Sequence, residues 1–400
     1  MIIPWGLALL CTSCLDPYPL PDVSSGLLVV DARFTNDPDA NRVILSFAGQ
    51  VNEGGIPISD AQVYIMDEEG NKEVCMESGI GVYIPDNEQF IGEVGRQYIL
   101  DIELTDGRRY LSDSSLFMDA PPIDELKWTL TEQPSDNNID MLYGVDIRLS
   151  THDPENQLKN YLWYYEEIWE VEIPFPVLEE YDGSGRTEQD FSRVDYTRDC
   201  YLSGRSYDIM MKTTRDQDES RIENLPIIFI SNESSRLWRD YRIRVRQFGL
   251  SEEAWLYHEQ LNEITSQNGS LFDKQPYRLR GNIRNANNSE EVVMGYFLTS
   301  VVSTETIEFS AWDLPDEYRG EYPLYWNCHN AADTFYISGR TNINWVINTY
   351  APSRNLVFTH SVWSDPLDLT PKLIGLFLVP RPCAFCEGTT ETPENWPVNK

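Results

Sequence analysis

Residues 97–112 read Gln97-Tyr-Ile-Leu-Asp-Ile-Glu-Leu-Thr-Asp-Gly-Arg-Arg-Tyr-Leu-Ser112, and this stretch decides the fold class. Apolar and polar side chains alternate over 97–103, which is the period of a β-strand with one buried face. Asp106-Gly107 then supplies the residue types that a tight hairpin turn requires, before a second short strand at 109–112. The stretch therefore predicts an antiparallel hairpin.

Further strand signals precede this hairpin at short intervals. They lie at 27–33, 42–47, 61–67 and 81–83, and residues 36–39 read as a turn between the first two. About seven short strands within some hundred residues are typical of a sandwich. We therefore predict an immunoglobulin-like or carboxypeptidase-regulatory-like β-sandwich over residues 26–120, which Pro121-Pro122 closes.

Residues 121–387 are expected to form a larger β-rich domain. Alternating patterns predict strands at 160–173, 236–248, 292–298 and 374–379. The domain is expected to contain one clear helix at about 252–267, which Ser251 caps and Gly269 ends. The polar tail at 388–400 is expected to be loose. The predicted fold class is mainly β.

The N-terminal residues resemble a secretory signal that ends in a cysteine. An uncharged apolar run reaches Leu10, and Thr12-Ser13 precedes Cys14. The run is too short to span a bilayer. We expect a signal peptide at 1–13, lipidation of Cys14 and a proline-rich tether at 14–25. The alternative is an ordinary signal peptide with an incidental cysteine, since no Lys or Arg precedes the run and Cys11 replaces the usual leucine.

The charge balance limits the classes of partner. Asp and Glu total 65 against 31 Lys and Arg, which gives a formal net charge of −34. We therefore do not expect non-specific binding to nucleic acids, because such binding needs clustered cations. The same charge argues against a protein that lies flat on an anionic leaflet.

Motifs for catalysis are missing from the sequence. His258-Glu-Gln-Leu-Asn262 begins like a zinc-protease helix, but Asn262 stands where the second ligand must be. The acidic stretches 136–140 and 216–219 lack the spacing of a calcium loop. No nucleophile elbow, phosphate-binding loop or dinucleotide fingerprint is present. We expect no catalytic residue, no metal and no cofactor, and thus a protein that is not an enzyme.

Five arginines gather within eleven residues of this acidic chain: Arg236, Arg239, Arg242, Arg244 and Arg246. They could form a strip that contacts an anion or a partner protein. The alternative is cross-strand pairing with the glutamates at 166, 167, 170 and 172, which is the more common arrangement.

The cysteines of an exported chain are permitted to form disulfides. Cys383-Ala-Phe-Cys386 follows two prolines instead of opening a helix, which argues against a redox role. We expect at least one of this pair in a disulfide, with Cys328 as the favoured long-range partner and a local 383–386 bond as the alternative. Among the interpretations of these cysteines, a metal site ranks second after a structural disulfide, and a catalytic role ranks last.

Several segments together resemble an uncharacterised family, a domain of unknown function found in Bacteroidota outer-membrane lipoproteins that are typically encoded beside TonB-dependent receptors. The matching segments follow one another along the chain. They are Cys14-Leu-Asp-Pro17, Leu28-Val-Val-Asp31, Ala61-Gln-Val-Tyr-Ile-Met-Asp67, Gly81-Val-Tyr83, Asp106-Gly-Arg-Arg-Tyr-Leu-Ser112, Asp119-Ala-Pro-Pro-Ile-Asp124, Cys200-Tyr201, 241–252, Gly281-Asn-Ile283, Val293-Met-Gly-Tyr-Phe297 and Cys383-Ala-Phe-Cys386. After Cys386 the chain departs from the family's usual ending.

The resemblance implies a location and a partner but no catalytic residues. The expected function is that of a non-enzymatic accessory or ligand-capture subunit of a TonB-dependent receptor, lipid-anchored in the outer membrane at the cell surface. A free surface protein that binds glycans or proteins is the first alternative, and an enzyme with an unrecognised site is the second. The glycan alternative depends on exposed rings among Trp163, Trp169, Trp238, Trp312, Trp326 and Trp345.

Overall fold

The structure is a computed structural model that describes residues 27–49, 55–135, 140–181, 187–188, 199–206, 208–266, 279, 281–320, 323–364, 370 and 372–386. The predicted signal peptide, Cys14, the tether and the tail at 388–400 lie outside these residues. The chain is mainly β, as predicted. It divides into two units, Met1–Met118 with Glu253–Val301 and Asp119–Glu252 with Val302–Lys400.

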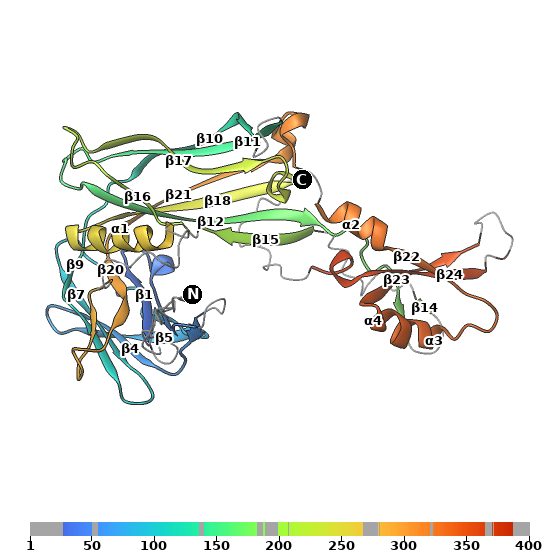
Figure 1. The fold of residues 1–400 in the computed structure, drawn as a ribbon, viewed down its shortest axis with the longest axis horizontal. Coiled ribbons are helices and arrows are strands. Elements are labelled where there is room, and N and C mark those ends of the chain that lie inside the picture. The colour runs from blue at the N-terminus through green and yellow to red at the C-terminus, as the bar shows by residue number, and fades with distance from the viewer. Residues whose placement is uncertain are drawn as a thin grey trace, which may run out of the picture. The chain divides into compact units, whose positions relative to one another are not determined.

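The first unit is built on one sheet of eleven strands (Figure 1). The predicted hairpin is present as β7 and β8, with Asp101 opposite Leu111. The sheet curls around a single buried core, so it resembles a sandwich without dividing into two hydrogen-bonded sheets. Its strands are β1 (Leu28–Phe34), β2 (Arg42–Phe47), β3 (Ile56–Pro57), β4 (Gln62–Asp67), β5 (Lys72–Gly79), β6 (Val82–Pro85), β7 (Gln97–Glu103), β8 (Arg109–Ser112), β9 (Ser115–Leu116), β19 (Ile283–Asn285) and β20 (Val293–Thr299).

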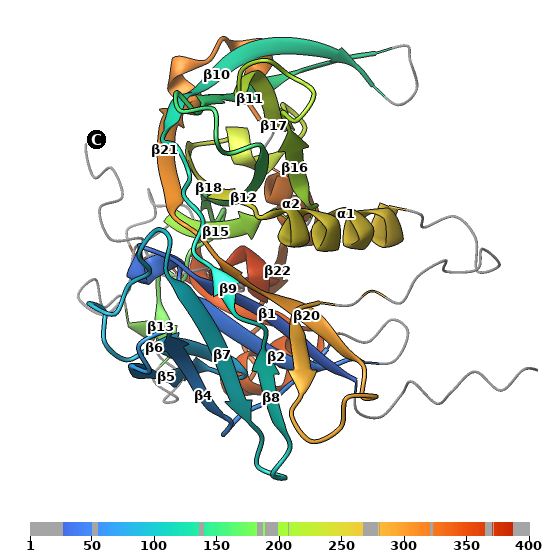
Figure 2. The same ribbon diagram turned by 90° about the vertical axis from the view of Figure 1, so that its left-hand side faces the viewer.

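Two of these strands come from a distant part of the sequence. β20 pairs in parallel with β1, and β19 pairs with β8, as Figure 2 shows for β1 and β20. Ile283 and Phe297 enter the same core as the N-terminal strands. Because β1 and β8 would otherwise be open edges, Glu253–Val301 joins the first unit instead of the continuous 121–387 domain that we expected.

Two glycines allow this distant segment to approach β1 closely. A Cβ on Gly281 would lie 1.5 Å from the carbonyl oxygen of Gly295, and a Cβ on Gly295 would lie 2.1 Å from that of Val30. Gly295 also has φ +145°, a conformation that favours glycine. The Asn282 side chain holds this close approach in place, since it donates to the Phe297 carbonyl and accepts from the Phe297 N–H.

The predicted helix is α1 (Glu252–Ser266), and residue 267 of the expected range lies outside the described residues. It packs on the outer face of β20, where the Tyr257 and Tyr296 ring centroids are 5.1 Å apart. His258 on the same side of α1 is buried beside Tyr296. The helix that we expected in the larger domain therefore packs against the first unit.

The second unit contains two facing antiparallel sheets (Figure 1). Gln247 of one sheet donates to Thr151 of the other at 3.0 Å, and the Trp128 and Phe309 rings meet at 5.3 Å. One sheet consists of β10 (Ile123–Pro134), β11 (Met141–His152) and β17 (Arg221–Ser231). The other consists of β12 (Asn160–Glu172), β15 (Asp199–Arg205), β16 (Met210–Thr213), β18 (Asp240–Gly249) and β21 (Val302–Ser310).

The strand predicted at 236–248 starts later than expected. The 3₁₀ turn η2 (Ser235–Leu237) occupies its first residues, and β18 begins at Asp240. The Ser234 hydroxyl accepts the Arg236 N–H, and Ser235 accepts from the Trp169 indole, so local hydrogen bonds favour the turn. The alternation of apolar and polar residues in the sequence does not indicate these hydrogen bonds.

Residues 323–386, here termed the C-terminal lobe, complete the second unit. A three-stranded sheet carries helical turns on one face, and both cover a small core of Val346, Ala351, Phe358, Leu376 and Leu378. The elements are α2 (Pro323–Ala331), β22 (Asp333–Tyr336), α3 (Ile343–Trp345), the π-turn η5 (Val346–Tyr350), α4 (Ala351–Ser353), β23 (Leu356–Trp363), β24 (Leu373–Pro380) and η6 (Arg381–Cys383). The short hairpin β13 (Glu180–Tyr181) and β14 (Thr187–Glu188) also belongs to this unit.

Candidate functional site

The arginine cluster lies on and beside β18 and contacts the glutamates of β12. Arg246 reaches Glu166 at 2.6 Å, and Arg239 reaches Glu172 at 2.5 Å and Glu170 at 3.9 Å. The strands are in register there, since Glu166 lies opposite Arg244. Opposite charges on neighbouring strands stabilise the sheet, as the cross-strand alternative requires.

The other three arginines differ in whether a described glutamate pairs with them. Arg242 pairs with Glu308 of β21, and Arg236 pairs with Glu167 at 2.7 Å. Arg244 forms no ion pair within the described ranges, although its strand position faces a glutamate. Among the described residues, four of the five arginines therefore neutralise carboxylates of their own unit, and Arg244 has no carboxylate partner there.

Glu167 is the most enclosed acid of this cluster. Its side chain is 1% exposed and accepts the Tyr241 hydroxyl at 2.7 Å. A Cβ on Gly204 would lie 2.5 Å from the Glu167 carboxylate, so the glycine of β15 leaves the space that this side chain occupies. Burial, and then the Glu167 charge, raise the pKa of Tyr241 well above its usual value. The arrangement holds a buried ion pair between β12 and the turn η2.

The cysteines form two disulfide bonds, and each bond includes one cysteine of the short segment 383–386. Cys328 bonds to Cys383, and Cys200 of β15 bonds to Cys386. The first is the long-range pairing that we favoured, and no local 383–386 bond forms. The second bond, from Cys200, was not among the expected pairings. Once four of the five cysteines after Cys14 are paired, Cys75 is left free and buried in the first core.

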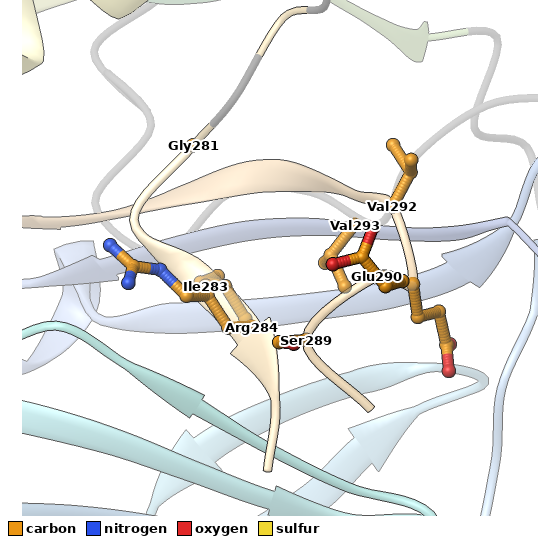
Figure 3. Close-up of a pocket in the computed structure, with 8 residues that line it drawn as sticks. Gly281, Ile283, Arg284, Ser289, Glu290, Val292 and Val293 are labelled. Carbon is orange, nitrogen blue, oxygen red and sulfur yellow. The ribbon is translucent and has the colours of Figure 1, made fainter. Parts of the chain in front are cut away.

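Two hollows in the described surface are small. One of about 80 Å³ lies between β19 and the start of β20, and its lining includes Ile283, Arg284 and Glu290 (Figure 3). The other, of about 230 Å³, is lined by residues of 119–122 and 153–158. Both volumes fall below the ~300 Å³ at which small-molecule pockets begin.

Several polar groups of these hollows already have partners within the chain. Arg284 pairs with Asp113 at 2.6 Å. Glu291 accepts from Tyr110 at 2.7 Å and from Asn285 at 2.6 Å. Asp153 accepts three backbone N–H groups of its own loop. These carboxylates therefore maintain local structure.

Among the described side chains, few of the tryptophans proposed for glycan binding are exposed. Trp163 is fully buried, whereas Trp312 is 64% and Trp345 49% exposed. These two exposed rings belong to different elements, the 3₁₀ turn η3 (Ala311–Asp313) and α3. Trp169 and Trp238 are half-buried, and the side chain of Trp326 lies outside the described residues. The described tryptophans of this set therefore supply two exposed rings, fewer than the three that the glycan alternative requires.

The described histidines, like the described acids, form no metal site. No group of three or more His, Cys, Asp or Glu within the described ranges could hold a metal ion. His258 lies on a buried helix face, with Nδ1 2.8 Å from the Ala254 carbonyl oxygen. Burial lowers its pKa, and the nearby Arg33 charge acts in the same direction, against Asp31 and the hydrogen bond.

We expect His258 to make the first unit less stable in acid. Its folded pKa lies below the unfolded value of 6.5, so the unfolded chain binds the proton more readily. The free energy of unfolding should fall as the pH drops below 6.5 and level off below the folded pKa. Urea unfolding at a series of pH values measures this loss. His258→Gln should reduce it and exposed His329→Gln should not, and equal pH profiles for the two variants would refute the assignment.

Comparisons with known proteins place the chain by sequence. No curated protein matches it significantly. None of the helices in the described ranges is long and apolar enough to cross a membrane. The profile of the domain of unknown function DUF4249 matches residues 16–306, which is well over half of the chain and includes the Asp119–Glu252 part of the second unit. The chain therefore belongs to the DUF4249 family of uncharacterised proteins.

Proposed function

We propose that this protein is a lipid-anchored outer-membrane lipoprotein of Bacteroidota that acts as a non-enzymatic accessory or ligand-capture subunit of a TonB-dependent receptor. The observation that carries the proposal most is the sequence of residues 1–16, where an uncharged apolar run leads through Thr12-Ser13 to Cys14. Acyl chains on that cysteine anchor a protein durably.

The proposal assigns no ligand to the charged groups described above, because most of them are engaged within the chain. The arginines that could have formed a basic strip are mostly consumed by ion pairs inside the second unit. The buried carboxylates have arginine, lysine, tyrosine or backbone partners, as Glu167 and Asp101 illustrate. In this proposal the first unit acts as spacer and docking module, and the second unit covers the receptor or captures its ligand.

The test is purification of the tagged chain from detergent-solubilised outer membranes. A TonB-dependent receptor is expected at a comparable molar amount, and the purified chain is expected to begin at an acylated Cys14. Cys14→Ser should abolish the acylation, and Cys11→Ser, three residues earlier, is the matched control that should retain it. Isolation of the chain with no receptor at comparable abundance would overturn the proposal.

A further inference from the structure

The strands β10 and β17 form the two margins of the sheet β10-β11-β17 (Figure 1). β17 is protected against pairing with a further strand, because Pro226 lacks an N–H, Asn224 has φ +51° and the register with β11 shifts twice. β10 has one register shift, at its start between Ile123 and Glu125, and then runs in unbroken register to Pro134. The sheet therefore has one protected margin and one regular margin.

The hydrogen bonds at the end of β10 show which of its backbone groups face away from β11. The Ser135 N–H donates to the Asp140 carbonyl at 2.9 Å, so residue 135 faces β11. The Tyr143 carbonyl, opposite Glu132, instead accepts from the Asn232 N–H next to β17. Since the pattern alternates along an antiparallel pair, the N–H and C=O groups of the even-numbered residues of β10 point outward. These residues are Leu126, Trp128, Leu130 and Glu132.

The outward backbone groups of β10 have no partner among the described residues. None of these N–H and C=O groups forms a hydrogen bond with a described part of the chain. The next outward position holds Pro134, which has no N–H to donate, so the regular stretch ends there. A row of unpaired backbone donors and acceptors is a template for an added strand.

The side chains at the same positions of β10 are apolar and incompletely covered. Leu130 lies opposite Val145 of β11, and Trp128 lies opposite Ile147. Val145 and Ile147 are fully buried, so this is the inner face of the sheet. Leu130 is nonetheless 39% exposed, and Trp128 is half-buried. A further strand beside β10 would cover both side chains with apolar residues of its own.

The margin of the facing sheet, β21, is less suited to an added strand. The Ala311 N–H donates to the Arg239 carbonyl next to β18, so residue 311 faces β18. By the same alternation, the outward residues of β21 are Thr304, Thr306 and Glu308. Glu308 already pairs with Arg242, and no apolar side chain of β21 is exposed. A strand added there would cover little apolar surface.

The chemistry of β10 selects its occupant. Only an extended polypeptide presents N–H and C=O groups at the spacing of these outward groups. A second copy, paired antiparallel so that the apolar side chains lie opposite one another, would set Asp124 opposite Glu132 twice. Each copy also carries a formal net charge of −34. A different protein avoids this repulsion and is able to place a Lys or Arg opposite Glu132, which has no ion-pair partner among the described residues.

We propose that β10 is a docking edge for an extended strand of a different protein, which lengthens the sheet β10-β11-β17 by one strand. The added strand has apolar side chains at alternate positions and a basic residue opposite Glu132. This inference rests on the proposed function for the identity of the partner, because it assigns the strand to the receptor. Within this assignment the second unit binds the receptor through backbone hydrogen bonds.

The first measurement is the amount of receptor that the tagged chain retains from solubilised outer membranes. Leu130→Pro removes an outward N–H and leaves the hydrogen bonds to β11 in place. It should reduce the retained receptor at least about tenfold, since it removes a hydrogen bond and an apolar contact together. Thr306→Pro is the matched control, because it makes the same change at an outward position of β21 and should retain the receptor at the wild-type level.

Hydrogen exchange read at single amides tests the added strand in the wild-type chain, so a folding defect of a variant does not decide the outcome. In the chain alone the outward amides of Trp128 and Leu130 should exchange fast, whereas those of Thr129 and Thr131, which face β11, should be protected. In the complex with the receptor the two outward amides should slow at least about tenfold, and the other two should change little.

The outcomes separate this inference from the proposed function. Equal retention of receptor by the Leu130→Pro and Thr306→Pro variants would overturn the docking edge and leave the proposed function standing. Protection of the Trp128 and Leu130 amides in the chain alone would also overturn the docking edge, because a segment of the chain itself would then cover β10. A wild-type chain without any receptor would overturn both.

Discussion

Replacing Cys328 and Cys383 together by alanine is expected to destabilise the C-terminal lobe by about 4 kcal/mol in the chain-entropy model of disulfides. The bond spans 55 residues, which include all three strands of the lobe. The lobe has only small buried clusters to compensate, and both bonded cysteines belong to one of them. At ~1.4 kcal/mol per tenfold change, the open population of the lobe should rise about a thousandfold.

Amide hydrogen exchange measures this result directly. Protection should fall in β22, β23 and β24, while β4 and β7 of the first unit should keep theirs. Cys75→Ala is the matched control, because it alters the free cysteine in the other core and should cost about 1 kcal/mol there. Unchanged protection of the lobe in the double variant would show that packing alone holds it.

Arg236→Met is expected to lower the free energy of unfolding by about 3 kcal/mol. The change leaves the Glu167 carboxylate, 1% exposed, with the Tyr241 hydroxyl as its remaining described partner. An uncompensated buried charge costs more than the ion pair itself contributes. Urea unfolding at neutral pH measures the loss.

A surface ion pair supplies the comparison. Arg284→Met removes the partner of Asp113, where the two side chains are 67% and 50% exposed, and should change stability by less than about 0.5 kcal/mol. Glu167→Gln added to Arg236→Met should restore part of the loss, because it removes the buried charge. If Arg236→Met and Arg284→Met unfold at the same urea concentration, the buried pair has no special role.

The local β-structure was predictable because it depends on neighbouring residues. Alternation and the Asp106-Gly107 turn indicated β7 and β8, and the cap at Ser251 indicated α1. The partners of β1 were not predictable in this way, since β20 lies more than 250 residues later and its pairing depends on tertiary packing. Gly281 and Gly295 were visible in the sequence, but the close backbone approach that requires them was not.

The candidate site was predictable only in its residue types. Opposite charges on the strands at 160–173 and 236–248 predicted ion pairs, and the register brings Glu166 next to Arg246. The turn at Ser235 moved Arg236 off the strand and gave it Glu167, which no alternation pattern indicates. Likewise, the irregular segment after the two prolines favoured a disulfide from Cys383 to Cys328, whereas the bond from Cys200 depends on how the end of the lobe meets β15.

The central claim is that this chain is an anchored subunit of a receptor. Native mass spectrometry of the tagged chain, released in detergent from outer membranes, tests it most directly. We predict a complex whose mass equals one TonB-dependent receptor plus one copy of this chain that begins at Cys14 and carries acyl groups. A chain that appears alone, or whose Cys14 carries no lipid, would contradict the account.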